Sequence, residues 1–172
     1  MKLMRFVCGE DRVRRGLYEP ERLPLARVVE GDLFGKTRLS KKTVEVKRIL
    51  APLDPPNVLA LGLNYRSHAD EFKENYPEVP ILFLKGTNSV IGPGEPILLP
   101  KAGPEEVDYE AELAVVIGKA AKNVSRKEAL DYVFGYTCAT DVAPGTGRSE
   151  NRDTSGPAGK VSIAFARWVP AS

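Results

Sequence analysis

The segment "VDYEAELAVVIG", residues 107–118, is the longest apolar-rich strand candidate in the chain, and it carries two carboxylates near its start. Side chains alternate along a strand, so Glu110 and Glu112 project from one face, about 6 to 7 Å apart along the backbone. Two like charges at this spacing repel each other, and burying unpaired charge is unfavourable. Any fold built around this strand must therefore bring positive charge or water to its start.

A divalent cation would remove that repulsion, because Mg²⁺ and Ca²⁺ take oxygen ligands and favour carboxylates. A third carboxylate, Asp141, falls near the end of the strand candidate "YTCATDV". The alternative is a solvated strand edge, on which the two glutamates pair with Lys101 or Lys119. The Glu-x-Glu spacing alone leaves both interpretations open.

The chain contains a single histidine, His68, with Glu71 three residues further on. On a helix these positions share a face, and a carboxylate that orients an imidazole is typical of general-base catalysis. The alternative is an exposed helical ion pair. Lys85 ends the apolar strand candidate "PILFLK", where its ammonium group either stabilises a developing oxyanion or ends the strand in water.

Composition indicates a soluble globular protein with a small-molecule partner. The 25 basic and 23 acidic residues leave a net charge of +2, too weak a field to predict binding to nucleic acid or to an anionic membrane. No apolar run reaches membrane-spanning length, and the start lacks the apolar region of a secretory signal, so we expect a cytoplasmic location. Cys8 and Cys138 show no metal-type spacing and are expected to be reduced.

The pattern of short strands predicts a β-rich α+β fold. Residues 1–50 form a small β-rich unit with strand candidates "KLMRFV", "LARVVEG" and "TVEVKRIL", and the proline-rich segment 51–57 reads as a linker. Residues 58–142 form a second unit with strand candidates "VLALG", "PILFLKG", "VDYEAELAVVIG" and "YTCATDV".

Two helices are predicted within the second unit. The charged segment "RSHADEFKEN" lacks glycine and proline, which favours a helix. The segment "SRKE" has the capping-box pattern at Ser125 and Glu128, and Gly135 is suited to end the helix that follows. The expected buried face of that helix comprises Ala129, Leu130, Val133 and Phe134.

Taken in order, five longer motifs resemble the fumarylacetoacetate hydrolase family: "GLNYRSHADE", "PILFLKG", "SVIGPGEPILLP", "VDYEAELAVVIGK" and "ALDYVFGYTCATDV". The match covers roughly residues 53–142. It implies part of a catalytic domain with a mixed β-roll. Residues 1–50 resemble, less distinctively, the small N-terminal domain of many bacterial members.

The resemblance also implies a site. Glu110, Glu112 and Asp141 would bind Mg²⁺, or in some members Mn²⁺ or Ca²⁺. His68 and Glu71 would activate water, and Lys85 would bind or polarise the substrate.

Members of the family act on β-dicarbonyl or oxo-acid compounds by hydrolysis, decarboxylation or isomerisation. A cation bound to such a substrate stabilises the enolate formed when a C–C bond breaks. Members commonly form homodimers. The competing interpretation is a truncated, non-catalytic remnant with at most weak metal binding.

The resemblance stops after Val142, and residues 143–172 are rich in Gly, Ser, Arg and Pro. Such a composition predicts disorder. Shifting the reading frame by one base after Val142 permits codons for S-A-R-D-W-Q and, from Asp153, for H-Q-W-A-R-G-K-S-F-D, which correspond to two motifs of the family. We therefore hypothesise a frameshift in the gene or in its sequencing, which the DNA sequence across codon 142 tests.

Overall fold

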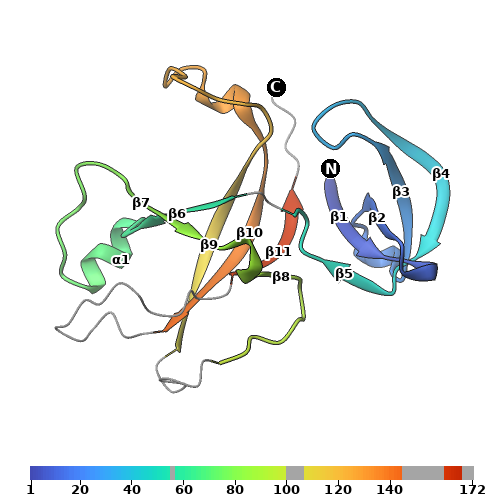
Figure 1. Cartoon of the computed structure of the whole chain (residues 1–172), viewed down its shortest axis with the longest axis horizontal. Helices are drawn as coiled ribbons and strands as arrows, with labels where there is room; N and C mark the ends of the chain where they lie inside the picture. The colour runs from blue at the N-terminus through green and yellow to red at the C-terminus, as the bar shows by residue number, and fades with distance from the viewer. Residues whose placement is uncertain (55–56, 100–106, 145–160, 168–172) are drawn as a thin grey trace.

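The computed structural model describes residues 1–54, 57–99, 107–144 and 161–167, with side chains through residue 142 (Figure 1). Strands dominate, and α1 (Arg66–Glu71) is the one α-helix among the described residues. Short 3₁₀ turns occur at Gly9–Asp11, Pro20–Arg22, Thr87–Ser89 and Ala129–Tyr132. The predicted β-rich class with few helices is confirmed. None of the described helices is long and apolar enough to cross a membrane.

The main sheet has the order β4-β3-β2-β1-β11-β10-β9, with β5 paired to β1 and β8 paired to β11. The remaining strands, β6 and β7, form a separate antiparallel pair. The strand bounds are β1 Lys2–Val7, β2 Val13–Leu17, β3 Leu25–Gly31, β4 Thr37–Glu45, β5 Arg48–Leu50, β6 Val58–Gly62, β7 Ile81–Lys85, β8 Val90–Ile91, β9 Val107–Ile117, β10 Val133–Pro144 and β11 Val161–Arg167.

The N-terminal strands β1 to β4 form an antiparallel meander around the fully buried Phe6. The predicted strands at β1 and β3 are confirmed with the expected bounds. The predicted strand "TVEVKRIL" is instead broken between β4 and β5. The break arises because the Val46 and Lys47 amides donate to the carbonyls of Pro24 and Val7, which turns the chain from β3 to β1.

Strand β11 lies between β1 and β10 and so joins the N-terminal strands to the β9–β10 ladder. The prediction of a disordered tail is therefore wrong for Val161–Arg167. The segment "VSIAFAR" alternates larger apolar residues with small ones, which is the period of a strand. The remaining residues after Pro144 lie outside the described part of the chain.

Side-chain packing also connects the two predicted units. The rings of Phe34 and Phe134 meet edge to face with centroids 5.0 Å apart. Phe134 also packs against the buried cluster of Leu3, Leu17 and Leu33. The division into units at residues 1–50 and 58–142 stays a prediction, because one sheet contains strands from both.

The helix predicted from Ser125 to Gly135 is wrong. The chain makes only a 3₁₀ turn at Ala129–Tyr132, and β10 begins at Val133, which pairs with Ile117 of β9. The Ser125 hydroxyl donates to the Glu128 carboxylate at 2.6 Å, so the two capping side chains bind each other. Pairing with β9 draws the β-branched and aromatic residues after the turn into the sheet.

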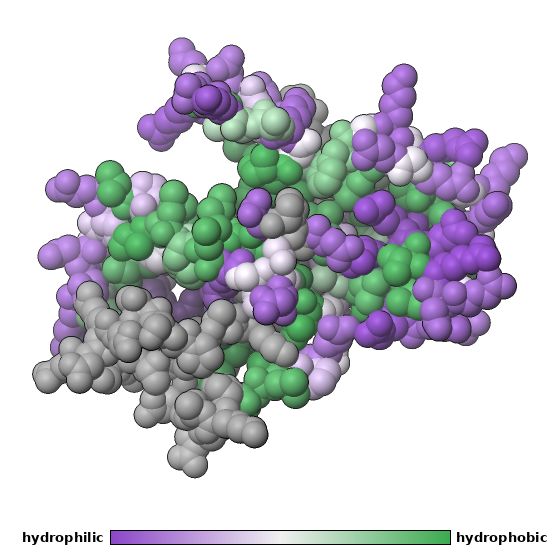
Figure 2. Space-filling view, viewed as in Figure 1, coloured by the Kyte–Doolittle hydropathy of each residue, from purple (hydrophilic) through white to green (hydrophobic). Residues whose placement is uncertain are grey.

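The β6–β7 pair lies beside the β9–β10 ladder in Figure 1 and ends at Lys85. Its apolar side chains are largely exposed, with Leu59, Leu82 and Leu84 each more than 60% accessible. Figure 2 shows this apolar surface in green over the same region. The small sheet therefore brings Lys85 to β10 while leaving much of its own apolar surface open.

Candidate active site

The β9–β10 ladder places the three predicted carboxylates on one face. Asp141 lies directly opposite Glu110, and Ala139 lies opposite Glu112. Directly opposed residues share a face, as do residues two apart on one strand. The register therefore brings Glu110, Glu112 and Asp141 together, although Asp141 comes 29 residues after Glu112 in the sequence.

The pKa of Glu112 is affected by the other groups at this face. Its pKa is raised, first by burial and then by the negative charge of Glu110, with a smaller contribution from Asp141. A hydrogen bond from Tyr65 and the charge of His68 act in the opposite direction. Strands β9 and β10 and the start of α1 thus converge on one half-buried carboxylate.

Lys85 supplies a buried positive charge to the same face. Its side chain is 8% exposed, and its ammonium group donates to Oδ1 of Asp141, whose side chain is 14% exposed. The alternative in which Lys85 ends its strand in water is therefore wrong. The ammonium group instead compensates the carboxylate at the end of β10.

The three carboxylates lie on one face but are not arranged around the common metal position that the sequence predicts. Within the described ranges, no group of three or more His, Cys, Asp or Glu side chains is arranged to hold a metal ion. Asp141 is held by Lys85, and Glu110 is exposed. The donor chemistry nevertheless fits a divalent cation, because three carboxylates share a face, and burial together with the charge of Glu110 raises the pKa of Glu112.

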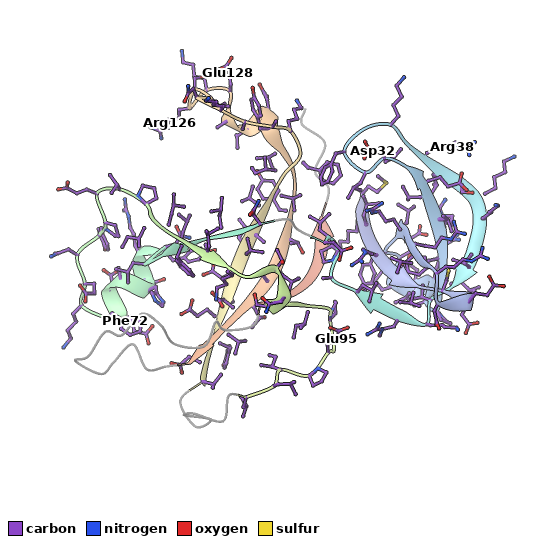
Figure 3. The ribbon with its side chains drawn as sticks, in the orientation of Figure 1. Asp32, Arg38, Phe72, Glu95, Arg126 and Glu128 are labelled. Carbon is purple, nitrogen blue, oxygen red and sulfur yellow. The ribbon has the colours of Figure 1, made fainter. Side chains whose placement is uncertain are left out.

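His68 and Glu71 do not form the predicted pair. His68 is half-buried, with its ring centroid 4.8 Å from that of Phe72 (labelled in Figure 3), whereas Glu71 is exposed. In the described part of the chain no hydrogen bond joins them. Of the alternative partners for the glutamates, Lys119 instead lies over the ring of Tyr132, and Lys101 is outside the described residues.

Tyr65 is a site residue that the sequence analysis missed. Its hydroxyl accepts a hydrogen bond from the Leu113 amide at 3.1 Å. Its backbone has φ 65° and ψ 122°, a conformation that costs about 1–3 kcal/mol for a residue other than glycine. The only signal in the sequence was its place in "NYRSHADE", beside residues that titrate.

The raised pKa of Glu112 predicts how the stability of the metal-free protein depends on pH. The folded state holds the Glu112 proton more tightly than the unfolded state does. The stabilisation that this proton gives the folded state is therefore complete below the ordinary pKa of 4.5. That contribution is lost as the pH rises through the higher pKa of the folded state. We expect Glu112→Gln to flatten this fall in the free energy of unfolding, measured by urea denaturation from acid to neutral pH. An equally steep fall in both proteins would contradict the assignment.

The sequence profile "Fumarylacetoacetate (FAA) hydrolase C-terminal" matches residues 57–167. The chain belongs to the fumarylacetoacetate hydrolase family. The matched range extends beyond Val142, where the sequence analysis ended the resemblance, and includes β11.

Relatives in this family include enzymes of several kinds. The chain is 49% identical over 113 residues to the caffeoylpyruvate hydrolase of Neonothopanus nambi, covering 62% of this chain and 39% of that protein. It is 39% identical over 124 residues to a mitochondrial oxaloacetate tautomerase of Xenopus laevis, covering 72% and 39%. The chain thus spans about two fifths of the length of these curated relatives.

Solved structures of the family share the fold. The crystal structure of 5-carboxymethyl-2-hydroxymuconate delta-isomerase from Mycobacterium smegmatis superposes with a TM-score of 0.78 at 28% identity, covering 98% of this chain and 66% of that one. The N-terminal strands are therefore part of the shared architecture.

Proposed function

We propose that the protein acts as a divalent-metal-dependent enzyme on β-dicarbonyl or oxo-acid substrates, by hydrolysis, decarboxylation or isomerisation. The observation that carries this proposal is the register that opposes Asp141 to Glu110, with Glu112 on the same face. The proposed partner is a small oxo acid. The hydrolase, tautomerase and isomerase activities in the names of relatives support the same class of chemistry.

Glu110, Glu112 and Asp141 would hold the cation, which we propose is Mg²⁺, Mn²⁺ or Ca²⁺. When bound, it supplies Lewis acidity to the carbonyl oxygens of a dicarbonyl acid. Burial and then the charge of Glu110 raise the pKa of Glu112, and a bound cation would offset the charge repulsion.

The remaining side chains supply binding and proton transfer. The half-buried His68 is near enough to influence Glu112, and an imidazole nitrogen there can accept a proton from water or from the substrate. Lys85 binds Asp141 with one N–H, and an ammonium group has two further donors for a substrate carboxylate.

The competing function is a non-catalytic remnant with weak metal binding. The exposed apolar side chains of β6 and β7 favour it. Assays with oxaloacetate and acetylpyruvate, with and without Mg²⁺, decide between the two. Turnover that depends on Mg²⁺ and is lost in Glu110→Gln supports the enzyme, whereas no turnover on either compound supports the remnant.

Glu110→Gln is also expected to weaken Mn²⁺ binding by at least about tenfold, the scale for losing even an outer-shell partner of a metal. Titration followed by electron paramagnetic resonance measures this change. Glu128→Gln is the matched control, since Glu128 is an exposed glutamate far from α1 (Figure 3). Equal affinity in the wild type and Glu110→Gln would remove Glu110 from the ligand set.

A further inference from the structure

We propose that Tyr65 is a positioning residue, which fixes the start of α1 against the edge of β9 and orients the Glu112 carboxylate. The role of the residues that it positions rests on the proposed function. The contacts themselves belong to the metal-free protein, so they can be tested separately.

The first contact is with an open sheet edge. Among the described strands, β9 is the last in the main sheet, so the backbone N–H groups on its outer side have no partner strand among them. The Leu113 amide donates to the Tyr65 hydroxyl at 3.1 Å, across 48 residues of sequence. Leu113 follows Glu112 directly, so Tyr65 is anchored beside the central carboxylate.

The second contact is with the carboxylate itself. A hydrogen bond from the Tyr65 hydroxyl opposes burial and the charge of Glu110, the two larger causes that raise the pKa of Glu112. Because its oxygen accepts from the Leu113 amide, its single proton is free to be donated to the carboxylate. One hydroxyl thus binds both the backbone and the side chain at this point of β9.

The third contact passes through the main chain to His68. The Tyr65 carbonyl accepts from the amides of His68 at 3.1 Å and Ala69 at 3.3 Å, so Tyr65 begins α1. Its side chain caps no amide of this helix and is directed to β9 instead. Its left-handed backbone lets one residue start the helix and reach the sheet. Tyr65 therefore links His68, the candidate general base, to Glu112, the candidate metal ligand.

Tyr65→Phe tests this proposal, with Tyr76→Phe as the matched control. The Tyr76 hydroxyl donates to the Asp70 carboxylate of α1 at 2.7 Å, so the control also removes a phenol hydrogen bond near α1 but none to β9. In the metal-free protein we expect amide hydrogen exchange at Leu113 to be about tenfold faster in Tyr65→Phe and unchanged in Tyr76→Phe. Mn²⁺ affinity is expected to fall about tenfold in Tyr65→Phe only, the scale of a lost outer-shell hydrogen bond.

A comparison within the wild type needs no substitution. The amides of Ala111 and Leu113 point to the same side of β9, because they are two residues apart. Slower exchange at Leu113 than at Ala111 is expected from the Tyr65 contact.

Equal exchange at these two amides, or unchanged exchange at Leu113 in Tyr65→Phe, would overturn the proposal whatever the metal result. Faster exchange with unchanged Mn²⁺ affinity would reduce Tyr65 to an anchor and also overturn its positioning role. A wild type that binds no Mn²⁺ would overturn the proposed function, and the positioning role would be overturned with it.

Discussion

Lys85→Met is expected to lower the free energy of unfolding by about 3–5 kcal/mol, the range for removing one partner of a buried ion pair. The loss of the ammonium group leaves the Asp141 carboxylate with little access to water and without its positive partner. The negative charges of Glu110 and Glu112 share the same face and add to the repulsion. Urea denaturation of the metal-free protein at neutral pH measures the change.

Lys47→Met is the matched control, because the Lys47 side chain is 54% exposed and its Nζ lies 3.8 Å from Oδ1 of the exposed Asp11. Its loss is expected to cost less than about 1 kcal/mol, as for other surface pairs. The double variant Lys85→Met with Asp141→Leu should recover most of the lost stability, since neither charge of the buried pair then remains. A loss in Lys85→Met as small as that of the control would show that Asp141 does not depend on this ammonium group.

Under the proposed function, His68→Gln is expected to lower kcat by about 10²- to 10⁴-fold, the usual contribution of a general base. Glutamine keeps hydrogen-bonding capacity but cannot take up a proton near neutral pH. The affinity for Mn²⁺ should change little, because the proposed ligands are carboxylates. Steady-state kinetics on the substrate found active, together with Mn²⁺ titration, separates the two effects.

Glu71→Gln tests whether the Glu71 carboxylate pairs with His68 during the reaction. Glu71 is exposed and makes no hydrogen bond with His68 within the described residues, so Glu71→Gln should lower kcat less than His68→Gln does. Equal losses would show that the two side chains pair during the reaction, as the sequence predicts. Full activity in His68→Gln would remove the histidine from proton transfer.

Much of the fold could be predicted because strands leave a local pattern. The bounds of β1, β3, β6 and β7 agree with their alternating or apolar segments. The capping pattern at Ser125 was misleading, because a local signal for a helix competed with pairing of β10 to β9 and lost. The alternation in "VSIAFAR" was hidden within a segment whose composition predicted disorder.

The sequence by itself determined that Glu110 and Glu112 share one face of a strand, because that depends only on side-chain alternation between near neighbours. The sequence also contains the motifs that the chain shares with its family. Only the tertiary structure decided that Lys85 compensates Asp141, across 56 residues, and that Tyr65 reaches Leu113, across 48. Such contacts depend on strand register and on how the small sheet packs against the ladder, and no local propensity encodes either.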